Sequence, residues 1–201
     1  MTRFLLAIVH LALAATSAPA GKFNKTLSIG DAAPAWENLD GTDGKKHSFS
    51  EFKDKELLVV VFTCNSCPVA EAYESRILEF AKANPNVGLV AMNVNTAKAD
   101  ALPAMKERAE KKKFTFPYLF DPSQEIARKY GAKYTPEFFV LNKDRKVVYM
   151  GAMDDKSPPG EAKAKHLEAA IKAAADGRKP ETAETSAASG CGIKFNPKKD
   201  D

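Results

Sequence analysis

An apolar run that ends at two closely spaced cysteines constrains the fold of this chain more than any other feature. The run covers 57–62 and is rich in β-branched residues, which is typical of a central strand buried on both faces. Cys64 and Cys67 follow it, and Pro68 opens a stretch whose apolar positions recur at helical spacing. The cysteines are therefore expected at a junction between a strand and a helix.

A thiolate is favoured at such a junction, because unpaired backbone N–H groups and the helix dipole stabilise negative charge there. The pKa of a thiol in this position can fall from about 8.5 to between about 3.5 and 7.5. We expect Cys64, at the mouth of the helix, to be the nucleophile and Cys67, one turn inside, to be the resolving thiol. Cys64 must then be non-helical, because helical i,i+3 Cβ atoms lie about 5–6 Å apart and a disulfide needs about 3.5–4.5 Å.

Other interpretations of the cysteine pair stay open on the residues alone. Zinc would need two further Cys or His ligands, and beyond the first twenty residues only His47, His166 and Cys191 remain, without ligand-like spacing, so no metal site is predicted. Copper delivery through the pair and a methionine such as Met150 or Met153 is one alternative. An inert disulfide is another, although it would close a very short loop and add little stability.

The first twenty residues have the pattern of a secretory signal peptide. Arg3 precedes an apolar run over 4–15, and Ala18-Pro19-Ala20 forms a small-x-small cleavage pattern. The run is shorter than the roughly 20 residues that span a bilayer, and no later segment is apolar enough to do so. We expect an exported protein, periplasmic or secreted, with no stable membrane insertion once 1–20 is removed.

The rest of the chain is long enough for one domain, which we place at 25–178. Strands that alternate with helices and end in a hairpin plus helix imply an α/β fold, with a mixed central sheet and helices on both faces. The expected elements are a hairpin with turns near Asp40-Gly41 and Asp43-Gly44, the strand at 57–62, a helix from 68 to 84, a strand at 87–94, a helix at about 102–112, a short strand at 117–121, a helix capped by Asp121, a hairpin turning at 142–145 and a helix over 161–177.

The tail at 179–201 is rich in Thr, Ala, Ser and Lys, and its composition indicates a flexible segment. It carries Cys191. Three cysteines are too few for a disulfide-built scaffold, and they leave this one without a close partner in the sequence. Cys191 could be a third thiol that captures or relays the disulfide, could form an intermolecular disulfide, or could stay free.

The charge pattern gives no indication of nucleic-acid binding. The chain has a formal net charge of +4, and its basic residues are scattered among acids. The lysine triplet 111–113 is typical of the solvated end of a helix.

Cys64-Asn65-Ser66-Cys67, with a strand before it and a helix after it, resembles the active-site motif of the thioredoxin superfamily. A Thr-Pro pair that opens a strand about 70 residues later strengthens the likeness. In that superfamily the corresponding proline is cis and lies against the active-site disulfide. The resemblance implies this role for Pro136, and it implies that the backbone of Thr135 pairs with an extended substrate.

The segment 29–52 is similar to the opening of the redoxin subgroup, which includes alkyl hydroperoxide reductase-like and TlpA/ResA-like proteins. The extra helix and strand at 101–120 also suit this subgroup. A particular likeness is to exported redoxin-domain proteins that carry F-x-C-N-x-C-P and, near the C-terminus, G-C-x-I-K, here FTCNSCP and GCGIK. The resemblance covers about 25–195.

This likeness implies a thioredoxin-like three-layer fold and a thiol-disulfide oxidoreductase. The redox centre would be the Cys64–Cys67 disulfide, with no other cofactor. The implied partners are protein dithiols and disulfides together with a redox partner, and the implied state is a monomer.

Three departures from the family pattern limit what the likeness implies. Thioredoxins place a buried acid six residues before the first cysteine, but here that residue is Leu58, and Glu71 is a candidate substitute unless it is a surface carboxylate. Peroxiredoxins place Pro and Thr or Ser seven and three residues before their peroxidatic cysteine, and here these are Leu57 and Val61. Asn65-Ser66 between the cysteines matches neither the Gly-Pro of reductants nor the Pro-His of oxidants, although both residues are expected to tune the couple.

Phe62, Tyr134 and Thr135 are the candidates for substrate contact, with a core position as the alternative for Phe62. The function predicted from the sequence is exchange of disulfides with partner proteins. The alternatives are a thiol peroxidase of peroxiredoxin type with Cys64 as peroxidatic thiol, and a non-enzymatic module of the same fold that binds copper or a partner protein.

Overall fold

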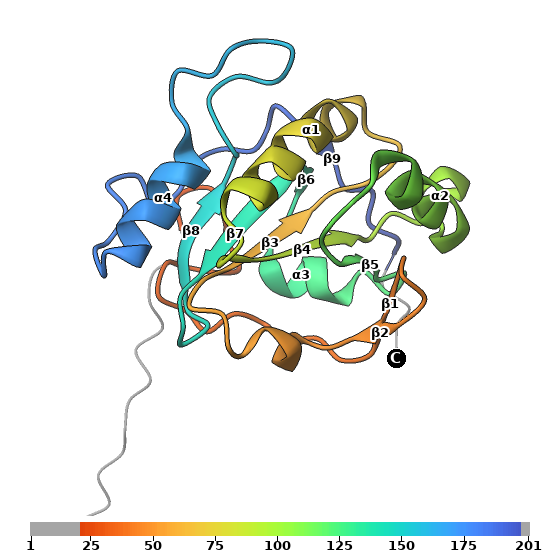
Figure 1. The fold of residues 1–201 in the computed structure, drawn as a ribbon, viewed down its shortest axis with the longest axis horizontal. Coiled ribbons are helices and arrows are strands. Elements are labelled where there is room, and N and C mark those ends of the chain that lie inside the picture. The colour runs from red at the N-terminus through yellow and green to blue at the C-terminus, as the bar shows by residue number, and fades with distance from the viewer. Residues whose placement is uncertain (1–20, 198–201) are drawn as a thin grey trace, which may run out of the picture.

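A seven-stranded sheet organises the chain, for which a computed structural model describes residues 21–197. The strand order is β2-β1-β5-β4-β3-β7-β8. The central strand β3 (Leu58–Phe62) runs parallel to β4 (Gly88–Asn93) and antiparallel to β7 (Glu137–Leu141). The sheet is therefore mixed, with helices on both faces (Figure 1), and the predicted α/β class is confirmed.

The other elements follow the expected alternation. They are β1 (Leu39–Gly41), β2 (Lys46–His47), the 3-10 turn η1 (Phe49–Phe52), α1 (Pro68–Ala83), the 3-10 turn η2 (Lys98–Asp100), α2 (Leu102–Lys112), β5 (Tyr118–Phe120), α3 (Glu125–Tyr130), β6 (Tyr134–Thr135), β8 (Val147–Gly151), α4 (His166–Ala175) and β9 (Cys191–Gly192).

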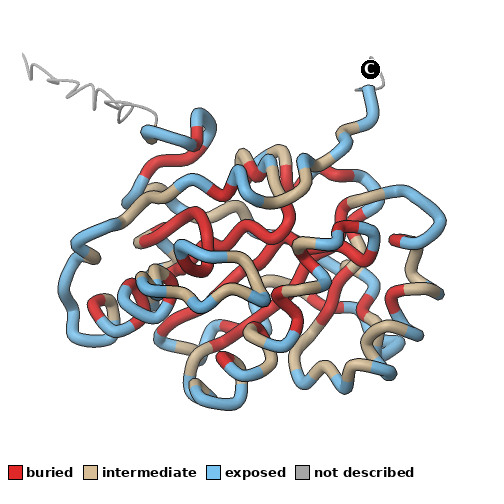
Figure 2. The backbone as a smooth tube through the Cα atoms, turned by 90° about the horizontal axis from the view of Figure 1, so that it is seen from above, coloured by how far each residue is buried: buried red, intermediate tan, exposed pale blue. Residues whose placement is uncertain are grey.

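Every residue of β3 is buried, because each face of this strand meets a different part of the core. Leu58, Val60 and Phe62 pack with α3 and the N-terminal segment. Val59 and Val61 pack with α1, α2 and α4. Figure 2 shows the buried stretches, in red, running through the middle of the molecule. The apolar run seen in the sequence is thus the centre of the fold, and it delivers the cysteines to one end of the sheet.

Most expected elements are confirmed, including both hairpins and α2. Two helices begin later than the patterns indicated: α4 starts at His166, and α3 starts at Glu125 rather than directly after Asp121. The carboxylate of Asp121 accepts the backbone N–H of Ser123 at 3.1 Å and of Ile126 at 3.0 Å. These contacts shape a turn before the helix, so Asp121 organises its start without being its N-cap residue.

The segment 190–196 lies against the domain, which differs from the flexible tail that composition indicated. β9 pairs with β6 outside the main sheet. Ile193 and Phe195 pack on the core, and Gln124 Nε2 donates a hydrogen bond to the Lys194 carbonyl at 3.0 Å. Two apolar side chains within a polar tail are enough to dock it once the fold provides a surface for them.

Two sequence predictions fall at the ends of the chain. The signal peptide at 1–20 and the last part of the tail, 198–201, lie outside the described residues. Within 21–197, no helix is both long enough and apolar enough to cross a membrane.

Candidate active site at the two cysteines

The second cysteine, not the first, caps helix α1. Cys67 is the N-cap residue, and its Sγ accepts the backbone N–H of Ala70 at 3.3 Å. The residue before a proline is held in an extended conformation, so Pro68 forces Cys67 out of the helix, and its φ and ψ are −92° and 116°. Cys64 lies three residues earlier in the loop. The expectation that Cys64 is at the helix mouth and Cys67 one turn inside was therefore wrong.

Thr135 contacts both sulfur atoms. Cys64 Sγ lies 3.3 Å from Thr135 Oγ1, and the Cys67 thiol donates to the Thr135 carbonyl at 3.2 Å. The Thr135–Pro136 peptide bond is cis, as the resemblance implies. Two segments some 70 residues apart in sequence thus meet at the cysteine pair.

The surroundings of Cys64 favour the protonated thiol. Burial raises the pKa of Cys64, and the negative charges of Asp100 and Cys67 raise it further, against opposing hydrogen bonds from Thr135 and Ser66. Cys64 in this arrangement is a weak nucleophile, contrary to the sequence-based argument from the helix dipole.

The surroundings of Cys67 favour the thiolate. Burial opposes its ionisation, but hydrogen bonds to its sulfur from the Cys191 thiol, the Ala70 N–H and the Thr135 hydroxyl outweigh burial and lower the pKa of Cys67. Negative charge at the reduced site therefore forms more readily on Cys67 than on Cys64. All three cysteines are free thiols here.

A buried carboxylate that the sequence analysis missed holds the loop between the cysteines. Asp100 is fully buried and accepts the backbone N–H groups of Asn65 at 2.7 Å and Ser66 at 3.2 Å. It also accepts the Ser66 hydroxyl at 2.5 Å, and Asn93 donates to it at 3.2 Å. Ser66 Oγ is 3.9 Å from Cys64 Sγ, so this hydroxyl lies between the carboxylate and the thiol. In the sequence, Asp100 is a single acid just before α2, and an acid in this position would ordinarily be assigned to helix capping.

Asn65, predicted to tune the couple, is anchored from three directions. Its side chain donates to the Ala99 carbonyl at 2.9 Å and accepts the Tyr118 hydroxyl at 3.0 Å. Its own carbonyl accepts a hydrogen bond from Arg108 at 3.1 Å. The loop between the cysteines is therefore fixed at both of its residues, Asn65 and Ser66, which preserves the spacing of the two sulfurs.

Two carboxylates of α1 lie near the site but differ in burial. Glu71, the proposed substitute for the missing buried acid, has a side chain that is 51 % exposed and pairs with Arg108 at 3.2 Å. Glu74 is buried and pairs with Arg108 at 2.9 Å and Lys112 at 3.0 Å. Glu71 is thus a surface carboxylate, whereas Glu74 and Asp100 are buried acids near the cysteines.

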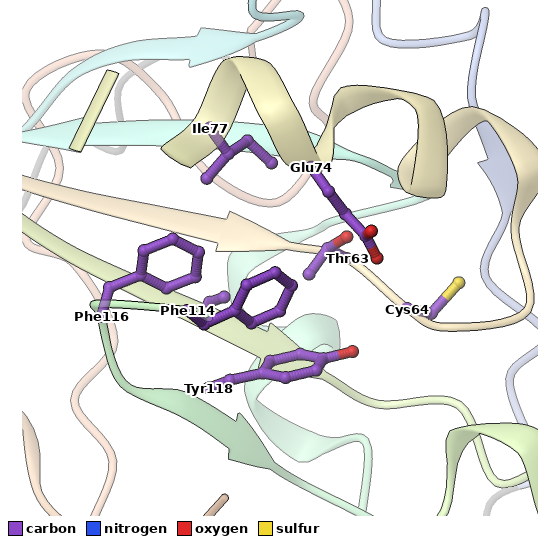
Figure 3. Close-up of a pocket in the computed structure, with 8 residues that line it drawn as sticks. Thr63, Cys64, Glu74, Ile77, Phe114, Phe116 and Tyr118 are labelled. Atoms are coloured by element: carbon purple, nitrogen blue, oxygen red, sulfur yellow. The ribbon is translucent and has the colours of Figure 1, made fainter. Parts of the chain in front are cut away.

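A small cavity adjoins Cys64 and Glu74 (Figure 3). Its volume is about 10 Å³, the size that holds one water molecule. Its aromatic wall comes from Phe114, Phe116 and Tyr118, and the Cys64 sulfur points away from these rings. The cavity is too small for a substrate, and Cys64 Sγ lies 3.3 Å from Thr135 Oγ1, which is not among the residues that line it.

The prediction that Phe62 contacts the substrate was wrong. It is fully buried and packs edge-on against Tyr130 and Phe139, with ring centroids 5.3 and 5.7 Å apart. Tyr134 and Thr135 form β6 and pair with β9. Tyr134 and Thr135 thus remain candidates for substrate contact, and Phe62 is a core residue.

Within 21–197, no cluster of three or more His, Cys, Asp or Glu side chains is placed to hold a metal ion. Met150 and Met153 belong to the two large core clusters, whereas Cys64 and Cys67 form a separate cluster with Ala70. The geometry therefore lends no support to a copper site built from the cysteines and one of these methionines.

Comparison with known proteins places the chain in a class that fits this geometry. Residues 28–171 match the family model described as Redoxin, so the chain belongs to the Redoxin family. A comparison with curated proteins gave no match.

Several solved structures share the fold. An uncharacterized conserved protein from Geobacillus kaustophilus is 32% identical, with a TM-score of 0.78 over 87% of this chain and 95% of its own. A hypothetical protein from Sinorhizobium meliloti 1021 is 29% identical, with a TM-score of 0.77 over 86% and 97% of the two chains. A secreted disulfide oxidoreductase of Mycobacterium tuberculosis is 20% identical, with a TM-score of 0.53 over 69% and 95%, and this likeness shows the thioredoxin-like fold alone.

Proposed function

We propose that this protein is an exported thiol-disulfide oxidoreductase that exchanges disulfides with partner proteins through the Cys64–Cys67 couple. The observation that carries the proposal is that both sulfurs lie against Thr135, at 3.3 and 3.2 Å, beside the cis proline. Membership of the Redoxin family supports it. Export is proposed from the signal-peptide pattern at 1–20.

In the proposed reaction, the Cys64 thiolate attacks one sulfur of a partner disulfide, and the other partner sulfur leaves as a thiol. Cys67 then attacks Cys64 Sγ in the mixed disulfide, which releases the reduced partner and closes the Cys64–Cys67 disulfide. The lowered pKa of Cys67, set by hydrogen bonds that outweigh burial, supplies the thiolate for this second step. The first step requires Cys64 to become exposed, because burial is the main cause of its raised pKa.

The proposal is tested by reduction of insulin disulfides with dithiothreitol as the electron source. We expect wild type to accelerate the reaction, Cys64→Ser to fall to the uncatalysed rate, and Cys67→Ser to accumulate a mixed disulfide detectable by mass spectrometry. Activity that survives Cys64→Ser would overturn the assignment. Hydrogen peroxide consumption without insulin reduction would instead favour the peroxidase alternative, although Val61 offers no activating hydroxyl at its position.

The direction of exchange is read from the reduction potential of the couple, measured by equilibration with glutathione buffers. A value near that of thioredoxin, about −270 mV, marks a reductant, and a value near about −120 mV marks an oxidant.

A further inference from the structure

The C-terminal strand β9 occupies the edge of β6, where an extended substrate would pair. Thr135 is the register partner of Cys191, and Tyr134 is that of Gly192. The backbone N–H of Ile193 donates to the Lys133 carbonyl at 2.8 Å, which continues the ladder. Addition of a strand to an exposed edge is a general mode of peptide recognition. The chain therefore places its own segment where a partner peptide would lie.

Two features hold this segment in place. Gln124 accepts the Asn196 N–H at 2.7 Å, and the Arg128 guanidinium lies 4.5 Å from the centroid of the Phe195 ring. At the other end, a Cβ on Gly190 would lie 2.5 Å from the Thr135 carbonyl oxygen. Only glycine permits an approach this close, so the sequence is adapted to the contact.

Cys191 packs against the Cys64–Cys67 cluster and donates a hydrogen bond to the Cys67 sulfur. Cys64 and Cys67 are only 3 and 2 % exposed. A partner disulfide cannot reach either sulfur while β9 is docked, whereas Cys191 is already in contact with one of them.

The protonation of Cys191 depends on the state of Cys67. The hydrogen bond to Cys67 is the first cause, with burial second, that raises the pKa of Cys191 to about 11. When Cys67 is part of a disulfide it carries no negative charge to accept this bond. Cys191 then loses the largest of the effects that raise its pKa, so it ionises more readily in the oxidised protein than in the reduced protein.

We propose that Cys191 is a third exchanging thiol of this site, presented to Cys67 by a strand that takes the place of a substrate peptide. In the oxidised protein, Cys191 loses its proton and attacks Cys67 Sγ. The Cys64–Cys67 bond breaks, Cys64 leaves and takes up a proton, and a Cys67–Cys191 disulfide forms with no net oxidation or reduction. This inference rests on the proposed function, which supplies the initial Cys64–Cys67 disulfide from a partner disulfide.

The first test maps disulfides in the full chain. Reduced protein is oxidised with diamide, trapped with N-ethylmaleimide and digested with trypsin, which separates 56–76, with the cysteine pair, from 179–194, with Cys191. We expect the cross-link between these peptides in wild type and in Cys64→Ser, and its loss in Cys67→Ser. Absence of the cross-link in Cys64→Ser, under conditions that oxidise the wild-type pair, would overturn the proposal.

The second test uses a matched pair of substitutions to distinguish the role of strand β9 from the role of the Cys191 thiol. Gly190→Ala forces the strand away from Thr135, whereas the nearest atom to a Cβ on Gly192 is 4.0 Å away, so Gly192→Ala fits. In the Cys64→Ser background, Gly190→Ala is expected to slow formation of the cross-link about tenfold, the equivalent of one or two lost hydrogen bonds, while Gly192→Ala leaves it unchanged. Equal rates for the two variants would contradict the role of β9.

Insulin reduction distinguishes failure of this inference from failure of the proposed function. If Cys191 is held in the substrate position, Gly190→Ala in the otherwise native chain reduces insulin faster than Gly192→Ala. Insulin reduction without any cross-link to 179–194 rejects the third thiol alone. A cross-link with no insulin reduction in any variant rejects the proposed function alone.

Discussion

At the scale of single residues, Asp100 organises the loop between the cysteines, although the sequence pattern around it gave little indication of this role. Its carboxylate holds both residues between the cysteines and raises the pKa of Cys64 by its charge, in addition to the larger effect of burial. It acts as a positioning group, because it reaches the thiol through the hydroxyl of Ser66.

Replacement of Asp100 by Asn is expected to change two properties at once. The pKa of Cys64 falls, because the negative charge that helps to raise it is gone. The free energy of unfolding falls by about 1–3 kcal/mol, because Asn keeps one acceptor oxygen for the backbone N–H groups of Asn65 and Ser66 but removes the oxygen that accepts the Ser66 hydroxyl. The pH dependence of Cys64 alkylation and urea unfolding measure these effects. Asp40→Asn, at an exposed acid, is the control. An unchanged alkylation profile in Asp100→Asn would show that the carboxylate does not act on the thiol.

Sequence patterns located the cysteines but reversed their positions relative to the helix. Spacing along the chain cannot show which residue is the N-cap, and the decisive factor was the steric restriction that Pro68 places on Cys67. Asp100 could not be found because its partners, Asn65 and Asn93, come from other parts of the chain and are brought together only by the sheet.

At the scale of elements, β6 depends on Glu137, the first residue of β7. One oxygen of this buried carboxylate accepts the N–H groups of Lys133 at 2.7 Å and Tyr134 at 3.0 Å. Burial raises the pKa of Glu137 despite these bonds. The short strand that faces both the cysteines and β9 is thus held from its far side by a group whose charged form is disfavoured.

Glu137→Gln and Glu137→Ala are expected to differ in stability at pH 7. Because the folded pKa lies above the unfolded one, the contribution of Glu137 is complete below the unfolded pKa and is lost as the pH rises through the folded value. Gln keeps an acceptor oxygen and never ionises, so its free energy of unfolding equals or exceeds that of wild type. Ala leaves both N–H groups unpaired and costs about 1–3 kcal/mol. Urea unfolding that finds the two variants equally destabilised would contradict this account.

Elements with strong periodicity were predictable, whereas elements that depend on contacts elsewhere in the fold were not. β3, α1 and α2 follow from their apolar patterns, because each pattern states which face must be buried. β9 has only two residues and no pattern of its own. It forms because β6 offers an unpaired edge. The composition of the tail could not show this edge, so it wrongly indicated that the segment around Cys191 is flexible.

At the scale of the whole molecule, several tyrosine and cysteine side chains with raised pKa values make the fold sensitive to alkali. Burial, followed by the hydrogen bond to Asp154, raises the pKa of Tyr73 to about 12. Burial raises the pKa of Tyr118 well above its ordinary value, and the pKa of Cys191 is about 11. The folded chain retains these protons at a pH at which the unfolded chain releases them.

Stability is therefore expected to fall as the pH rises above about 9. The unfolded groups ionise near their ordinary values of 9.0 for thiols and 10.0 for tyrosines, and the loss continues as the pH passes through the raised folded values. Guanidinium unfolding between pH 8 and 11 measures the decline, and Tyr73→Phe should make it shallower above pH 10. A free energy of unfolding that is constant up to pH 11 would be inconsistent with the raised pKa values of these tyrosines and of Cys191.

Because β9 belongs to the same chain as the site that it covers, its effective concentration there is on the order of millimolar, as for other short tethers. A free peptide at micromolar concentration must therefore bind the β6 edge roughly a thousandfold more tightly to occupy it half of the time. Unfolded chains with exposed disulfides would compete poorly on these terms. If the protein exchanges disulfides as proposed, only a partner with high affinity of its own for this protein would displace β9, and its binding would release a seven-residue segment, 190–196, from the surface of the domain.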